Sequence, residues 1–209
     1  MDIQLVVKNI VVIGNFNPLK FDKYFFLKNN IFEENEILET SIFLPEFCML
    51  QTSFVNIQIT SQQLIVNDIN IDIFHDISSL SKKIISYSDF SANAAGVNFH
   101  FYKFTKHQTQ NLSKKYFYSE NNLINKFFDG EDVNYGYYIS KNYNNARLKL
   151  DIKPATVQNL ESNINEKLIQ FQFNFHVDFE NNSKDVLYSV IEKYENYYEE
   201  AKKIITIYE

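Results

Sequence analysis

The residues of this sequence with the clearest chemical potential are two histidines in alternating segments. His100 lies in the segment GVNFHFYKF, and His176 lies in LIQFQFNFHVDF, where Asp178 follows it. An imidazole beside a carboxylate can act as a general base, because histidine titrates near neutral pH and the carboxylate orients the ring. If the two segments are neighbouring strands, His100, His176 and Asp178 form a candidate catalytic set. Asn98 and Asn174 then share the polar face with the histidines and are candidate partner-binding residues.

The other histidines and the single cysteine give no pattern typical of a metal site. His75 precedes Asp76 at an expected helix start, and His107 lies in a polar loop segment, TKHQTQ. None of the histidines forms H-x-H, H-x-x-x-H or HExxH, so the sequence predicts no metal and no cofactor. Cys48 lies between two apolar residues and is expected to be a small buried hydrophobe. The alternative is a nucleophilic thiol, which requires a histidine base nearby.

Charge and composition disfavour nucleic acid as a partner. The formal net charge is -6, and the 20 basic residues include one arginine, Arg147. Sequence-independent binding of nucleic acid needs a basic surface, and base recognition often uses the arginine fork. The abundance of Asn, Ile, Lys, Phe and Tyr is typical of an AT-rich genome, so the 14 tyrosines and 20 phenylalanines do not indicate a base-stacking surface.

Nothing in the sequence predicts a membrane location. No run of about 18 apolar residues could span a bilayer. The start, Met1 to Gln4, has an acidic residue where a secretory signal carries positive charge, and no apolar signal core follows. The hydrophobic fraction of 45% with 22% charged residues is typical of a folded globular chain. We therefore expect a cytoplasmic protein.

Alternation of apolar and polar residues predicts the strands that position the histidines. In the segment 168–179 every odd-numbered position is apolar and the even-numbered positions between them are polar. Six apolar side chains on one face, each worth roughly 1.5–3 kcal/mol when buried, fix the register, because a one-residue slip exposes all of them. The segment 97–104 alternates in the same way, with His100 on its polar side. Both polar faces are expected to lie on the wetter side of a sheet.

The same pattern predicts the elements around these two strands. Further strands are expected over residues 3–13, 135–140 and 146–152, and Pro154 ends the last of these. Three or four short strands are expected between 42 and 74. The alternation of Ile69, Ile71 and Ile73 predicts one of them. Apolar spacings of three and four predict helices over 77–88, 111–128 and 183–208, the second of them broken, with Ser119 as an N-cap.

The last of these segments has a heptad pattern that allows two interpretations. Seven apolar or aromatic residues recur at alternating spacings of four and three: Leu187, Ile191, Tyr194, Tyr198, Ala201, Ile205 and Tyr208. The first interpretation is a helix packed across its own sheet. The second is the seam of a homodimer, in which Ile191, Tyr194, Tyr198 and Ile205 bind the partner.

Four motifs follow one another along the chain: AAGVNFHFYKF, ARLKLDI, FHVDFENN and VLYSVIEKYENYYEEAKKII. Together they cover 46 of the 209 residues. In this order they resemble a sporadically distributed family of uncharacterised bacterial α+β proteins. The resemblance implies an α+β protein of unknown activity, encoded in accessory or mobile loci, and it supplies no catalytic residues.

We expect an α+β fold in which a curved, mainly antiparallel sheet has helices on one face and a long C-terminal helix. The chain forms one domain over 1–209, or two β-rich halves, 1–106 and 130–209, joined by a helical segment over 107–129. The leading hypothesis is a non-enzymatic protein-binding or assembly factor that uses the polar sheet face or the C-terminal helix. The alternative is a metal- or histidine-dependent hydrolase. Either activity fits an accessory factor of a phage-defence or mobile-element locus.

Overall fold

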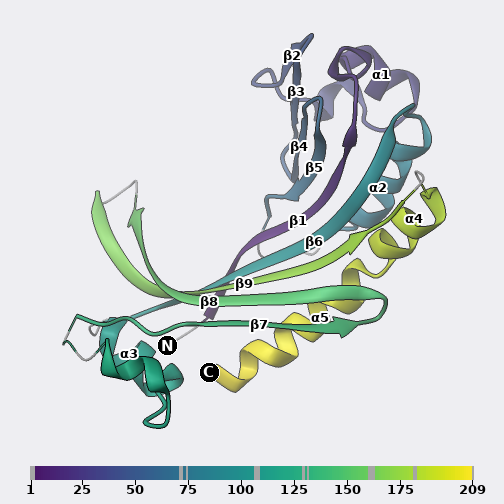
Figure 1. Ribbon diagram of the computed structural model, residues 1–209. Helices are drawn as coiled ribbons and strands as arrows, with labels where there is room; N and C mark the ends of the chain where they lie inside the picture. Colours follow the sequence, from purple (N-terminus) through teal and green to yellow (C-terminus); the bar gives the residue numbers. More distant parts are fainter. Residues whose placement is uncertain are drawn as a thin grey trace.

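The alternating segments of the sequence form one antiparallel sheet, which runs through the whole molecule (Figure 1). The computed structural model describes residues 3–70, 73, 75–105, 109–128, 130, 132–159, 163–180 and 183–208. The strands are β1 (Ile3–Asn15), β2 (Ile42–Leu44), β3 (Phe47–Gln51), β4 (Val55–Ile59), β5 (Gln63–Asp68), β6 (Ser91–Phe104), β7 (Tyr137–Tyr143), β8 (Ala146–Asn159) and β9 (Ile164–Asp178). Their order across the sheet is β2-β3-β4-β5-β1-β6-β9-β8-β7, and each neighbouring pair is antiparallel.

Helices occupy one side of this sheet. The α-helices of the described residues are α1 (Lys23–Lys28), α2 (Ile77–Ser86), α3 (Thr109–Phe117), α4 (Lys184–Glu192) and α5 (Tyr194–Ile205). Short 3-10 turns are η1 (Pro18–Lys20), η2 (Glu34–Glu36), η3 (Leu123–Lys126) and η4 (Thr206–Tyr208). Figure 1 shows α2, α4 and α5 against the same face, which confirms the predicted α+β class with an antiparallel sheet. We call the opposite face, which carries Asn9, Asn98 and Asn174, the open face. Each described helix is too short or too polar to cross a membrane.

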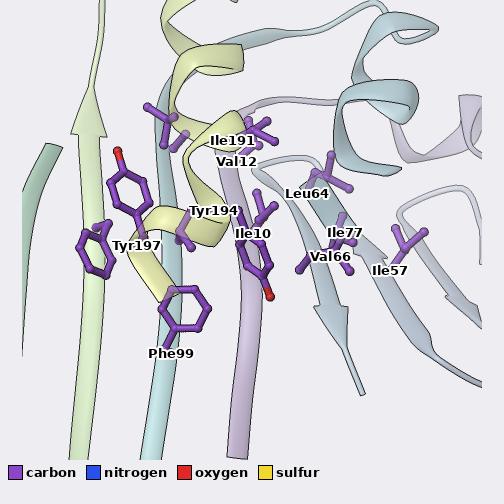
Figure 2. Close-up of a cluster of buried hydrophobic side chains, with 14 of the residues drawn as sticks. Ile10, Val12, Ile57, Leu64, Val66, Ile77, Phe99, Ile191, Tyr194 and Tyr197 are labelled. Atoms are coloured by element: carbon purple, nitrogen blue, oxygen red, sulfur yellow. The ribbon is translucent and has the colours of Figure 1, made fainter. Parts of the chain in front are cut away.

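The core lies between the sheet and these helices. Phe171, Phe173 and Phe175 of β9 are completely buried, which confirms the apolar side predicted for that strand. Figure 2 shows the region in which the aliphatic side chains of β1, β4 and β5 meet α2, and in which Phe99 of β6 meets Tyr194 of α5. The strands therefore alternate between this core and the open face, as their sequence pattern requires.

Strand β8 is longer than predicted, because Pro154 lies within it and does not end it. β8 pairs with β9 as far as Asn159, and Pro154 stands opposite Ile169. β7 begins opposite Ile152. Beyond that point, no strand of the described residues pairs with the outer side of β8. Proline is tolerated at such an edge, where its missing N–H breaks no ladder hydrogen bond.

The C-terminal segment forms two helices, so the prediction of one long helix over 183–208 is wrong. A turn at Lys193 separates α4 from α5. The break changes which side chains face the sheet. Tyr197, which is not part of the heptad pattern, is fully buried and stacks on Phe175 with 4.3 Å between ring centroids. The heptad positions Tyr194, Ala201 and Ile205 are buried beside it, which confirms the first interpretation, in which this segment packs across its own sheet.

The predicted helix over 111–128 is also shorter than expected. α3 ends at Phe117, and the polar run that follows it stops the helix, because Ser and Asn side chains compete for backbone hydrogen bonds. The N-cap of the following turn is Asn122, whose Oδ1 accepts the N–H of Ile124 at 3.2 Å, and not Ser119. Four large apolar residues expected to pack on the sheet are each more than half exposed: Leu123, Ile124, Phe127 and Phe128.

Candidate functional site

The open face carries a row of hydrogen-bonded asparagines across four adjacent strands. The pairing register places Asn67 of β5, Asn9 of β1, Asn98 of β6 and Asn174 of β9 directly opposite one another. Three of them donate from Nδ2 to the Oδ1 atom of the preceding residue in this row, at 3.0 Å from Asn9 to Asn67, 2.8 Å from Asn98 to Asn9 and 2.7 Å from Asn174 to Asn98. We call these four residues the asparagine ladder.

The ladder holds its own amide groups in a fixed orientation. An asparagine amide has two donor hydrogens and an acceptor oxygen with two lone pairs. Within the ladder, Asn9 and Asn98 each use one donor hydrogen and one lone pair. Each therefore has a second donor hydrogen and a second lone pair for another group. All four side chains are half-buried. The ladder is therefore an ordered row of donors and acceptors suited to binding, and it contains no acid, base or nucleophile.

The two candidate histidines lie on the open face but at different places. β6 and β9 are neighbours, and His100 stands opposite Gln172 while His176 stands opposite Gly96. Positions 96 and 100 are about 13 Å apart along β6, at about 3.3 Å per residue. The ladder pair of Asn98 and Asn174 lies between them. The structure therefore does not bring His100 and His176 together on one reacting atom.

His176 and Asp178 form a pair at an open cavity of about 550 Å³. His176 Nε2 lies 2.9 Å from Asp178 Oδ1, and 84% of the Asp178 side chain is exposed. Arg147 lines the same cavity from the neighbouring strand β8. Its guanidinium donates from Nη1 to Asn142 Oδ1 at 3.1 Å and from Nη2 to Ser140 Oγ. The arginine is thus anchored toward β7 by two side chains of that strand.

The surroundings of His176 define the orientation of its ring. A general base needs one ring nitrogen held by the protein and the other directed at its substrate. Nε2 lies 2.9 Å from Asp178 Oδ1, and Nδ1 lies on the side of Gly96 of the neighbouring strand. The carboxylate therefore orients the ring, and the alternative of a histidine-dependent hydrolase stays a prediction.

Metal and thiol chemistry find no support in the residues that the structure describes. In that part of the chain, no group of three or more His, Cys, Asp or Glu side chains could hold a metal ion. His107 lies outside the described residues. Cys48 is fully buried, which confirms that it is a core residue. Burial, with a further contribution from the charge of Asp22, raises the pKa of its thiol to about 12, so the reactive thiolate is not formed near neutral pH.

The partner-binding residues expected on the C-terminal helix face the core of their own chain. Ile191, Tyr194 and Ile205 are buried, and the ring centroid of Tyr198 lies 5.3 Å from that of Phe99. These side chains cover the apolar face of the sheet, which would otherwise meet water. We therefore correct the assignment of Ile191, Tyr194 and Ile205 from partner-binding to core residues, whereas Tyr198 is half-buried and its assignment stays a prediction.

The helix-covered face carries a buried charged network that sequence analysis missed. Lys8 Nζ lies 2.8 Å from Asp68 Oδ2, and the two side chains are 1% and 0% exposed. Asp68 also accepts the backbone N–H groups of Asn70 and His75, and His75 Nδ1 lies 3.0 Å from Asp68 Oδ1. Lys8 Nζ donates to the carbonyl oxygens of Asn70 at 2.7 Å and Ile73 at 2.9 Å. The network fastens the segment between β5 and α2 to the sheet.

A signal for this network is present in the sequence. Lys8 is two residues from Ile10 and Asp68 is two residues from Val66, so each charged side chain points to the same face of its strand as a buried apolar one. Their register pairs them directly across β1 and β5. Two opposite charges at apolar phases of different strands indicate a buried ion pair, because either charge alone would be costly to bury.

The network also marks the end of β5. This strand ends at Asp68, because the side chain of this residue binds the following backbone. Of the alternating residues predicted to form a further strand, Ile69 and Ile73 are exposed and are not in a strand. Ile71 lies outside the described residues.

Comparison with known proteins gives no assignment. No family model matches the sequence, and no curated protein gives a significant match. The resemblance to uncharacterised bacterial proteins stays a prediction. The geometry of the open face is the basis for a functional proposal.

Proposed function

We propose that this chain is a non-enzymatic binding and assembly protein, and that its open face binds a second protein through a surface rich in amide groups. The observation that carries the proposal is the asparagine ladder, with three hydrogen bonds in series across four strands. Its amide groups can recognise the backbone or the polar side chains of a partner. They cannot perform acid–base or nucleophilic chemistry.

The chemistry of the partner follows from the charge of the open face. On β4, β5, β1, β6 and β9 the ladder and the rows beside it contain amide, aliphatic and imidazole groups, and the next strand, β8, adds Arg147, Lys149 and Asp151 opposite His176, Asn174 and Gln172. These rows are Asn56, Gln58, Ile65, Asn67, Val7, Asn9, Val11, Gly96, Asn98, His100, Gln172, Asn174 and His176. Burial, and then the charge of Lys153, lowers the pKa of His100, which keeps this ring neutral at pH 7. The polar groups of a partner would therefore meet amides at the centre of the open face, and its charged groups would meet Arg147, Lys149 and Asp151 on the β8 side.

The shape and order of the open face also support the proposal. In Figure 1 the end of the sheet formed by β2 to β5 and the far tip of β8 and β9 both bend away from the helices, so the open face is concave. The ladder orients its side chains before a partner arrives. Association then costs less conformational entropy than it would with free amides.

The proposal is tested by removing the centre of the ladder. The immobilised chain is used to recover a partner from a lysate of the source cells, and the recovered protein is then titrated against the variants. Asn98→Ala and Asn174→Ala should each weaken its binding roughly tenfold or more, since each truncation leaves amide groups of the ladder and the partner unpaired.

The matched control is Asn196→Ala. This asparagine is exposed on α5, on the helix-covered side, so its truncation should leave binding unchanged. Thermal unfolding of each variant checks that the fold is kept. Equal binding by Asn98→Ala, Asn174→Ala and the unmodified chain would contradict the proposal.

A further inference from the structure

β7 is an edge strand whose outer side pairs with no strand of the described residues (Figure 1). Tyr138 and Ile139 are 64% and 52% exposed. The single charge of β7, Lys141, is held by Glu200 of α5 at 2.8 Å. The other edge of the sheet is protected, because β2 has three residues and is followed by Pro45, and short strands and proline both hinder edge pairing. The two edges therefore differ in their readiness to accept another strand.

The hairpin turn decides which backbone groups of β7 face outward. Both asparagines of the two-residue turn after Tyr143 have positive φ, 47° and 66°, as a type I′ turn requires. Such a turn closes on a hydrogen-bonded pair, and bonded and non-bonded pairs alternate along an antiparallel ladder. The backbone N–H and C=O groups of Tyr138, Ser140 and Asn142 therefore face the free edge.

An apolar cavity of about 220 Å³ lies beside this edge. Its lining comes from β7, β8 and α5: Ile139, Ser140, Lys141, Leu148, Leu150 and Ile204. The odd-numbered residues of β7 point to the helix-covered face, and a strand added to β7 would point its alternate side chains to the same face. One of those side chains would then lie against this cavity.

The surface area of the chain indicates a large uncovered interface. The accessible surface is 12211 Å² for a mass of 24.8 kDa. A monomer of this mass is expected to expose about 10,000 Å². The excess, about 2,000 Å², is larger than the roughly 800 Å² that each partner buries in a standard interface. The excess is therefore large enough to include the surface that one copy would bury in a dimer contact of ordinary size.

We propose that the free edge is occupied by a second copy of this chain, whose β7 pairs antiparallel with the first β7 across a two-fold axis at Ser140. This register uses all three outward-facing residues of each strand. It places Ile139 opposite Lys141 of the second copy, so no like charges meet, whereas an axis at Lys141 would place this cation opposite itself. Ile139 of the second copy lies beside the apolar cavity. The contact is isologous and closes as a dimer with one continuous sheet.

Light scattering after size exclusion, at concentrations up to about 100 µM, tests this dimer. The unmodified chain should have twice the 24.8 kDa mass of one copy. Ser140→Pro removes an outward N–H and should give a monomer that keeps its fold, since proline is tolerated at an edge. Ser140→Ala is the matched control and should stay dimeric, because it loses only the contact with Arg147.

A charge pair tests the register. Ile139→Lys places two cations opposite each other and should raise the dissociation constant roughly tenfold or more, whereas Ile139→Glu faces Lys141 of the second copy and should remain dimeric. A monomeric unmodified chain would overturn the proposal and leave this edge to an extended segment of another protein. A dimer that survives both Ser140→Pro and Ile139→Lys would place the contact elsewhere. Substitutions in the asparagine ladder should not change the mass, so this proposal and the proposed function fail independently.

Discussion

Two histidine–aspartate pairs lie on opposite faces of the same sheet and differ mainly in burial. His75 Nδ1 lies 3.0 Å from Asp68 Oδ1, and His176 Nε2 lies 2.9 Å from Asp178 Oδ1. The Asp68 side chain is fully buried, whereas that of Asp178 is 84% exposed. Asp68 also faces Lys8 and accepts two backbone N–H groups. The length of the contact is therefore almost the same, but the surroundings are not.

The comparison shows that distance alone does not measure what a charged contact contributes. Water screens the exposed pair, so breaking it changes little. The contacts of Asp68 exclude water, and removing a member of this group takes a close charged contact from a side chain that solvent does not reach. The open face can therefore change its polar groups at low cost to stability, as a binding surface requires, while the helix-covered face cannot.

The largest expected effect is that of Asp68→Asn. The substitution keeps the size of the side chain but removes the carboxylate charge 2.8 Å from Lys8 Nζ, and the Lys8 side chain is 1% exposed. The free energy of unfolding, measured with urea, should fall by about 3–5 kcal/mol. The same substitution at the exposed pair, Asp178→Asn, should cost about 0–1 kcal/mol. Equal losses at the two aspartates would show that burial does not separate the pairs.

A smaller difference is expected between the two histidines. His75→Gln should cost about 1–3 kcal/mol, because buried Asp68 loses a partner and Phe54 loses a ring whose centroid lies 5.1 Å away. His176→Gln should stay within about 0.5 kcal/mol. Thermal and urea unfolding of both variants measure this difference. A larger loss at His176 would contradict the assignment of the exposed pair to a surface role.

The smallest effect concerns His100, which is partly buried on the open face. Burial lowers its pKa in the folded chain, with the charge of Lys153 as the second cause. The unfolded chain therefore takes up a proton first, and stability should fall as the pH drops through about 6.5, the ordinary histidine pKa. Melting temperatures between about pH 5 and pH 8 should show this fall. His100→Gln should make the dependence shallower, and an unchanged slope would contradict the prediction.

Much of the local structure could be predicted from the sequence. The strand pattern of residues 168–179 and 97–104 is local, because alternate side chains must face opposite sides of a strand. It placed His100 and His176 on one polar face. The helix over 77–88 was predicted for the same kind of reason, and its N-cap is Asp76, whose Oδ1 accepts the N–H of Ser79 at 3.0 Å.

The errors arose where long-range contacts override local preference. The turn at Lys193 divides the predicted C-terminal helix, and Tyr197, which is outside the heptad pattern, joins the buried side of α5 by stacking on Phe175. Pro154 is accommodated because β8 has become an edge at that point within the described sheet. The order of strands across the sheet decides both outcomes, and neither has a local signal.

The sequence by itself determined which residues face the core and which face the open side, since the period of a strand is set by the geometry of its backbone. Only the tertiary structure decided which of those residues meet. Asn67, Asn9 and Asn98 come from separate segments, and they form a row because three strands pair in one particular register. Register depends on the burial of many side chains at once. The asparagine ladder is therefore a property of the whole sheet and of no single segment.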